Sequence, residues 1–119
     1  MSQNLVAVCY KVLRYIEACR SKDAQPDPAQ AFRLSEAGEM FFADACESMA
    51  SKGFVSGVEV TRYISGRSEV SFDDARITYD GSEFLADNAG MLKAARALGP
   101  AYETAVGVAV AQLLKAMGV

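Results

Sequence analysis

Residues 54–78 read FVSGVEVTRYISGRSEVSFDDARIT, and this stretch decides the fold. Its first part, Phe54 to Ile64, is rich in β-branched and aromatic residues, and Gly57 within it is typical of a β-bulge. The polar run at residues 65–68 is a turn, after which the apolar pattern resumes from Glu69 to Thr78. The stretch therefore predicts a β-hairpin.

An amphipathic helix and a short second helix are predicted before the hairpin. From Leu5 to Cys19 the apolar residues recur every three or four positions, with charged residues between them. A loop with two prolines follows over residues 21–28. Because Asp27 can cap a helix and Pro28 suits the first helical position, we expect a short helix from there to about Arg33.

A third helix is predicted from Ser35 to about Lys52. Ser35 precedes an acidic stretch that complements the positive end of a helix dipole, and Gly53 is a stop signal. The helix carries no lysine or arginine before its end, and four acidic residues lie along it: Glu36, Glu39, Asp44 and Glu47. We expect it to present a negatively charged surface.

Two more helices are predicted after the hairpin. Thr78 is expected to cap a helix from Tyr79 to Leu98. Gly99-Pro100 ends the pattern. A last helix over about residues 101–117 carries charge at only two positions.

The order helix, short helix, helix, β-hairpin, helix is that of a winged helix-turn-helix. The expected fold class is mainly α with a small β-hairpin wing, an α+β fold, and an extra apolar helix at the C-terminal end. We find no internal repeat and no linker. A single domain over residues 1–119 is therefore predicted, with its winged-helix core at about residues 4–98.

A resemblance to known proteins supports this order of elements. Residues 76–85, RITYDGSEFL, resemble the junction by which many winged-helix domains leave the wing. This resemblance implies that Gly81 lets the helix after the wing lie close to its neighbours. More narrowly, the chain resembles the YjcQ family of small winged-helix proteins, which are common in prophages of Gram-positive bacteria. The matching stretches are YKVLRYIE at 10–17, GFVSGV at 53–58, ITYDGSEFLADN at 77–88 and MLKAA at 91–95.

What this resemblance implies is a fold. It covers about residues 4–98 and supplies neither an established activity nor a catalytic residue. The sequence departs from the family pattern at Gly90, where a helix-forming residue is expected, and in the added helix after Pro100.

Composition excludes several classes of chemistry. The chain of 119 residues has no histidine, which removes Ser-His-Asp and Cys-His nucleophile systems and histidine-based zinc motifs. Its three cysteines, Cys9, Cys19 and Cys46, show no Cys-x-x-Cys spacing, and the glycines form no phosphate-binding loop. We therefore expect no enzyme, no catalytic residue, no metal, no cofactor and no small-molecule substrate.

The N-terminal region and the apolar stretches indicate where the protein is found. Residues 1–3 contain no basic residue, and the first helical pattern carries charges that the core of a signal peptide would not tolerate. The longest apolar stretch, Ala105 to Ala111, is far shorter than the ~18 residues of a membrane span. We expect a cytoplasmic protein that does not enter a membrane.

DNA is one candidate partner of the protein. Winged-helix domains insert their third helix into the major groove, with Lys and Arg on the phosphates. Here the acidic third helix and a net charge of −3 oppose that arrangement. The candidate nucleic-acid contacts are therefore in the wing and first helix: Arg62, Tyr63, Arg67, Lys11 and Arg14. The alternative interpretation is that these side chains form a solvated hairpin edge and the solvent-exposed face of the first helix.

A protein is the other candidate partner. In this interpretation the contact surface is the acidic third helix, through Glu36, Glu39, Asp44 and Glu47. The fold favours DNA and the charge favours protein. The sequence therefore leaves two functions open: a DNA-binding transcriptional regulator, or a phage-encoded module that modulates a host factor in the bacterial cytoplasm.

The last helix predicts self-association. It is apolar on nearly every face, and a small winged-helix core covers only one side of such a helix. Gly107 and Ala111, four residues apart, permit close approach of another helix. We expect a homodimer through this helix, alone or with the helix before it, and the candidate contacts are Val106, Val110, Leu113, Leu114 and Met117.

Overall fold

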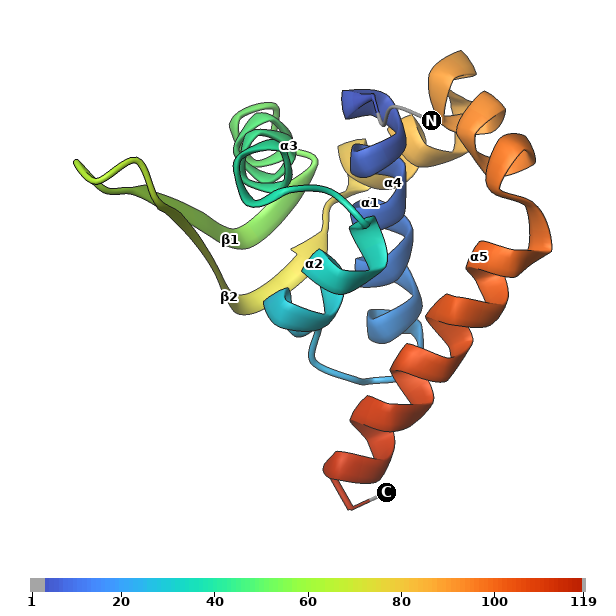
Figure 1. The fold of residues 1–119 in the computed structure, drawn as a ribbon. Coiled ribbons are helices and arrows are strands. Elements are labelled where there is room, and N and C mark those ends of the chain that lie inside the picture. Colours follow the sequence, from blue (N-terminus) through green and yellow to red (C-terminus); the bar gives the residue numbers. More distant parts are fainter. Residues whose placement is uncertain (1–3, 119) are drawn as a thin grey trace.

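The computed structural model describes residues 4–118 and arranges helices around one long hairpin (Figure 1). Along the chain the elements are α1 (Leu5–Ser21), α2 (Pro28–Ser35), α3 (Glu39–Ser51), β1 (Val55–Arg62), β2 (Ser68–Ile77), α4 (Tyr79–Asp87) and α5 (Ala89–Ala116). The expected α+β class, a winged-helix arrangement with an added C-terminal helix, is confirmed.

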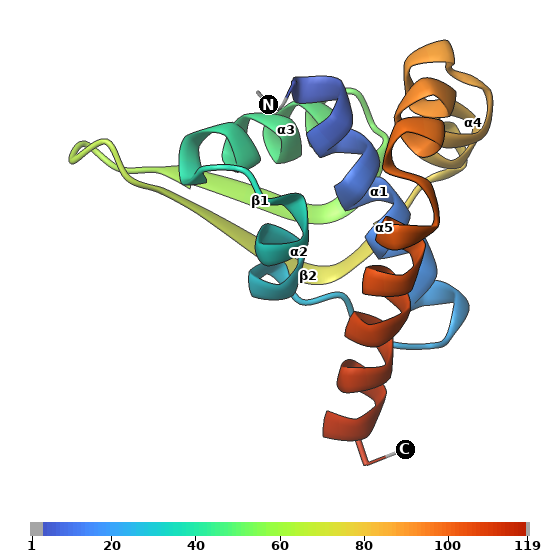
Figure 2. The same cartoon turned by 45° about the vertical axis from the view of Figure 1, so that its right-hand side comes forward.

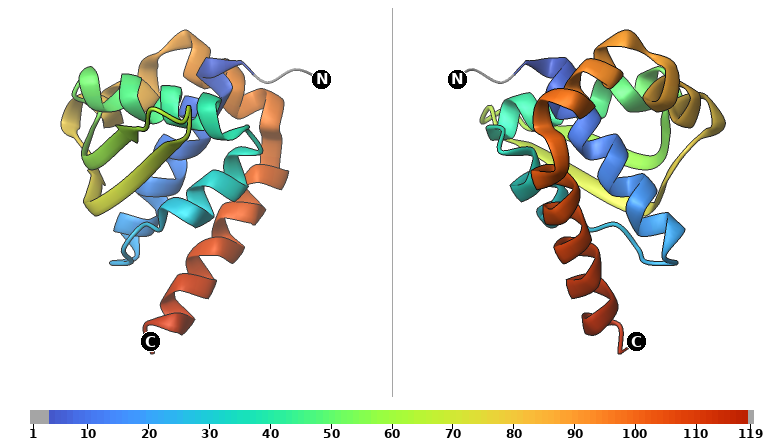
Figure 3. Two further views of the ribbon diagram at one scale, coloured as in Figure 1. Left: turned by 60° about the vertical axis from the view of Figure 1, so that its left-hand side comes forward. Right: turned by 90° about the vertical axis from the view of Figure 1, so that its right-hand side faces the viewer.

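Helix α1 forms the centre of the core. Its side chains Val8, Val12, Leu13, Tyr15 and Ile16 are almost completely buried. The helix packs against α2, α3, α4, α5 and β2, so it is covered on several sides (Figure 3). This central position explains why its polar face is narrower than the sequence pattern predicts.

The hairpin is the wing, and its far end extends beyond the helices (Figure 2). Strands β1 and β2 are antiparallel, with Val60 opposite Val70, and the register shifts between Ser56 and Val58. Gly57 lies at this shift with a φ of +74°, and a Cβ there would lie 2.2 Å from the carbonyl oxygen of Asp73. The predicted bulge at Gly57 is therefore confirmed, and only glycine fits it.

The exit from the wing into α4 is tightly packed. The Thr78 hydroxyl accepts a hydrogen bond from the Gly81 amide at 3.1 Å, and the Thr78 amide donates to the Phe54 carbonyl at 3.0 Å. A Cβ on Gly81 would lie 2.0 Å from that carbonyl oxygen and 2.9 Å from the Ile77 side chain. Both predictions, the Thr78 cap and the close approach at Gly81, are confirmed.

The start of the third helix differs from the prediction. Ser35 ends α2, and Glu36 follows in the left-handed conformation, with its amide donating to the Arg33 carbonyl at 3.2 Å. The Ser35 hydroxyl donates to the Phe32 carbonyl at 2.7 Å and accepts from the Ala37 amide at 3.2 Å. Ser35 therefore caps the end of α2, and α3 begins only at Glu39.

The helix predicted from Tyr79 to Leu98 is two helices. The chain is extended at Asn88, whose side-chain oxygen accepts from the amides of Gly90 at 2.9 Å and Met91 at 3.2 Å. Asparagine is among the best N-cap residues, so this local hydrogen bonding ends α4 and starts α5. The single-helix prediction is wrong for this reason.

Helix α5 bends at the predicted breakpoint and then returns along the core. Gly99 is non-helical, with a φ of 61°, so the Gly99-Pro100 boundary appears as a kink. Within residues 4–118, α5 is the one helix long and apolar enough to cross a membrane, judged by length and composition alone. Its second half is nonetheless joined to the core by two buried hydrogen bonds, from Tyr102 to the Lys11 carbonyl and from Gln30 to the Ala109 carbonyl.

Candidate functional site

The turn end of the wing is joined to α3 by one arginine. Arg62, at the end of β1, donates from Nη2 to Asp44 at 2.9 Å and to Glu47 at 3.1 Å, and from Nη1 to the Ser68 hydroxyl at 2.9 Å. Asp44 and Glu47 are three residues apart on α3, so they lie one turn apart on one face. The arginine therefore joins both wing strands to the third helix.

These contacts set the electrostatics of the site. The hydrogen bond that Arg62 donates to Glu47, followed by the one that it donates to Asp44, raises the pKa of Arg62. The guanidinium already donates to three side chains, so its hydrogen-bonding capacity toward a phosphate is largely used. The proposed role of Arg62 as a nucleic-acid contact therefore conflicts with the pairing that the structure shows.

A second contact joins the beginning of α3 to the wing. Glu39 accepts a hydrogen bond from the backbone amide of Ser68 at 3.0 Å. Three of the four acidic residues predicted as a partner surface, Glu39, Asp44 and Glu47, thus lie together beside the wing. Glu36 does not belong to α3, because it occupies the turn after α2, where it is exposed.

Helix α3 also carries an exposed apolar side chain that the sequence interpretation missed. Met40 is 67% exposed and lies four residues before Asp44, on the same side of the helix. The buried side of α3 is formed by Phe42, Ala43, Ala45, Cys46 and Met49. The signal available in the sequence was that Met40 falls outside this buried periodicity. We call Glu39, Met40, Asp44 and Glu47 the α3 face.

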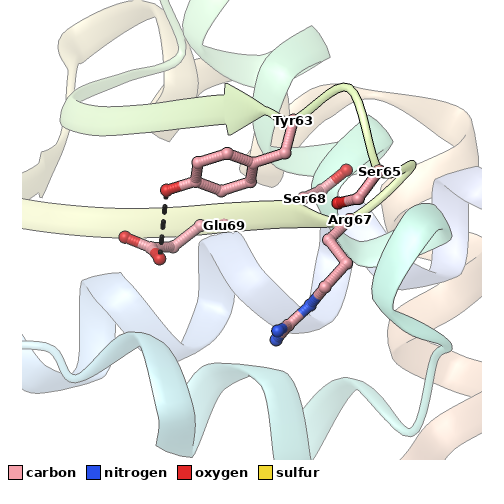
Figure 4. Close-up of a pocket in the computed structure, with 5 residues that line it drawn as sticks. All are labelled: Tyr63, Ser65, Arg67, Ser68 and Glu69. Atoms are coloured by element: carbon pink, nitrogen blue, oxygen red, sulfur yellow. Dashed lines mark hydrogen bonds between the residues drawn. The ribbon is translucent and has the colours of Figure 1, made fainter.

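The tip of the wing is a separate surface. A shallow pocket of about 390 Å³ is lined by Tyr63, Ser65, Arg67, Ser68 and Glu69, and the Arg67 side chain extends away from the Tyr63 ring (Figure 4). No ion pair within residues 4–118 holds Arg67. The neighbouring Ile64 is fully exposed, and nothing in the sequence interpretation had singled it out.

The two candidate contacts on α1 do not form a free basic surface. Lys11 is only 5% exposed, and its ammonium group donates to the Ser35 carbonyl at 3.2 Å, at the end of α2. Arg14 forms a bidentate pair with Glu103, with distances of 2.7 and 3.0 Å, and lies 3.4 Å from Glu17. The solvent-exposed position expected for Lys11 is wrong, because α2 and α5 cover this part of α1.

A comparison with known proteins identifies the family. The model of the family described as YjcQ protein matches residues 10–103, which include α2, α3, the wing and α4. The chain belongs to the YjcQ family. No curated protein and no solved structure matches it.

The part of α5 after residue 103 lies outside the region that matches the YjcQ family. The structure places Val106 and Val110, two of the predicted dimer contacts, in the chain's own core, at 2% and 6% exposure. Leu113 and Leu114 are half-buried and Met117 is 49% exposed. Of the five predicted dimer contacts, two are therefore buried in the chain's own core and three keep some exposed surface.

The cysteines of this YjcQ-family chain are packed side chains. Burial raises the pKa of Cys46 to about 12 and the pKa values of Cys9 and Cys19 to about 11. At neutral pH these groups are thiols, which are poor nucleophiles. Among residues 4–118, no three Cys, Asp or Glu side chains gather as a metal site requires.

Proposed function

We propose that this YjcQ-family protein is a non-enzymatic binding module of the bacterial cytoplasm, and that its α3 face binds a basic segment of another protein. In this proposal it is a prophage-type modulator of a host factor. The observation that carries the proposal is the pairing of Arg62 with Asp44 and Glu47.

This pairing matters because α3 itself carries no lysine or arginine, and the arginine beside it is already bound to two of its carboxylates. Asp44 and Glu47 share one arginine, and Glu39 is bonded only to the backbone amide of Ser68, so the face keeps a negative charge after the pairing. Docking α3 in a DNA groove would bring these carboxylates toward phosphates. DNA binding is driven by cationic side chains that replace the counterions of the phosphates, so this arrangement would be unfavourable. A segment with lysine or arginine is complementary to the same face.

Met40 supplies the apolar part of the proposed contact. Protein interfaces combine a desolvated apolar centre with charged residues at the rim, and methionine adapts well to such surfaces. Met40 is largely exposed and lies between carboxylates. The partner segment is therefore expected to carry an apolar residue flanked by basic residues.

The test compares two double variants by affinity capture from a bacterial extract. The immobilised wild-type protein is expected to retain a protein, and Glu39→Gln with Met40→Ser is expected to release it. The matched control, Glu83→Gln with Leu92→Ser, changes an exposed acid and an exposed apolar residue on α4 and α5. Equal capture by all three proteins contradicts the role of the α3 face.

A second candidate function, DNA binding through the wing tip, rests on Ile64 and Arg67. Minor-groove binders combine arginine with an apolar side chain that inserts between base steps, and these two residues are exposed together. A gel shift at low salt distinguishes the two candidates. If the tip binds duplex DNA, Arg67→Ala and Ile64→Ser abolish the shift, whereas Glu39→Gln leaves it intact.

A further inference from the structure

A groove lies between α1 and the second half of α5. It has a volume of about 350 Å³, and its apolar lining includes Gly107, Ala111 and Leu114. Its polar rim includes Arg14 and Lys22. The C-terminal part of α5 extends beyond the other elements (Figures 1 and 3), and Gly107 and Ala111 are exposed.

At Gly107 the groove is lined by backbone alone, because glycine has no side chain. A Cβ built on this glycine meets no atom within 4 Å, so nothing in the chain itself requires glycine there. Glycine is nevertheless the least favourable residue in a helix interior after proline. A second helix lying against Gly107 and Ala111 would give these small residues a packing role, because small residues let two helix backbones approach closely.

The charges around the groove indicate which helix fits. Arg14 lies beside Glu103 at one end, and Lys22 from α1 lines the groove toward the other end. Lys115 is exposed and directly follows Leu114, a lining residue of α5. Within residues 4–118, no ion pair holds Lys22 or Lys115. The groove therefore has a cationic end without a carboxylate partner in the part of the chain that the structure describes.

The second half of α5 has the complementary charge order. Its two charged residues, Glu103 and Lys115, lie six residues on either side of position 109, and Gly107 and Ala111 lie two residues on either side of it. If two copies of α5 run antiparallel, the Arg14–Glu103 pair of the second copy comes level with the cationic end of the groove, where Glu103 is shared between its own Arg14 and the lysines of the first copy. A parallel pair would instead bring like charges level with each other.

We propose that a second copy of this chain occupies the groove. The two α5 helices pack antiparallel across a two-fold axis near position 109, and each lies in the α1–α5 groove of the other copy. The two α1–α5 pairs thereby form a four-helix arrangement with an isologous interface. Val108 and Leu114, which are exposed and half-buried in one copy, lie beside this contact.

The first experiment fills the groove. Gly107→Trp fits the open space of a single copy but blocks the second helix, so the variant is expected to be a folded monomer where the wild type is a dimer. Gln112→Trp, on an exposed part of the helix away from the groove, is the control and is expected to remain a dimer. Analytical ultracentrifugation at micromolar concentrations measures the oligomeric state, and circular dichroism confirms folding.

The second experiment tests the charge order. Lys115→Glu is expected to raise the dimer dissociation constant by roughly tenfold or more at low salt, and the control Lys93→Glu is expected to leave it unchanged. A wild-type protein that sediments only as a monomer overturns the proposal. A Gly107→Trp variant that still dimerises, or equal dissociation constants for the two lysine variants, also overturns it.

Discussion

Two helical glycines mark the difference between the wing exit and the second half of α5. At the wing exit, Gly81 faces the Phe54 carbonyl so closely that no side chain fits. In α5, Gly107 faces open space. The contacts within the chain explain the first glycine completely and leave the second without a role. The wing exit is therefore complete in one copy, whereas the α1–α5 side is where we propose that a second copy binds.

The largest expected effect is the loss of stability in Gly81→Leu, which is compared with the same substitution at Gly107. Gly81→Leu is expected to destabilise the fold by more than ~3 kcal/mol, beyond the usual range for overpacking, because the side chain would push α4 off the wing. Gly107→Leu is expected to cost a single copy no stability, and to raise its free energy of unfolding slightly because leucine favours a helix more than glycine does. Urea denaturation measures both. Equal loss of stability in the two variants would remove the contrast.

The next effect separates the buried from the exposed side of α5. Val110→Glu is expected to cost ~1–3 kcal/mol, because this side chain is 6% exposed and a carboxylate there loses hydration without a partner. Gln112→Glu, on the exposed side, is expected to change the melting temperature little. Thermal melts compare the two. A stable Val110→Glu protein would mean that this face of α5 does not pack on the core.

A smaller effect is expected at the cap of α4. Thr78→Ala removes the acceptor of the Gly81 amide and the hydroxyl bonded to the Gly53 carbonyl, and we expect a loss of ~1 kcal/mol. Thr78→Ser keeps the hydroxyl and is the matched control. Thermal unfolding of the pair isolates the contribution of the cap, and identical midpoints would show that the wing exit does not depend on it.

The smallest effect has the opposite sign. Gly107→Ala adds one methyl group in open space and improves helix propensity, so it is expected to stabilise a single copy by ~0.5–1 kcal/mol. Measuring unfolding at concentrations where the protein is monomeric separates this gain from any change in dimerisation. A loss of stability instead would show that Gly107 has a contact or conformational role within the chain.

Local rules allowed much of the fold to be predicted from the sequence. The hairpin with its bulge at Gly57, the Asp27 and Thr78 caps, and the break at Gly99-Pro100 each depend on residues that are neighbours in the chain. Propensity, capping and turn chemistry act over such short distances. Asn88 and Ser35 were the exceptions. The capping signal of Asn88 lies within a pattern that continues as a helix on either side, and Ser35 ends α2 instead of starting α3.

The candidate site depended on contacts between distant residues. The sequence placed acids on α3 and an arginine on the wing, but only the tertiary structure pairs Arg62 with residues 15 and 18 positions away. The same holds for Lys11, which is buried under α2, and for Arg14, which meets Glu103 across 89 positions. The sequence by itself determined which elements form and which charges they carry. The tertiary structure decided which charges remain free, because ion pairing depends on distances that chain neighbours do not define.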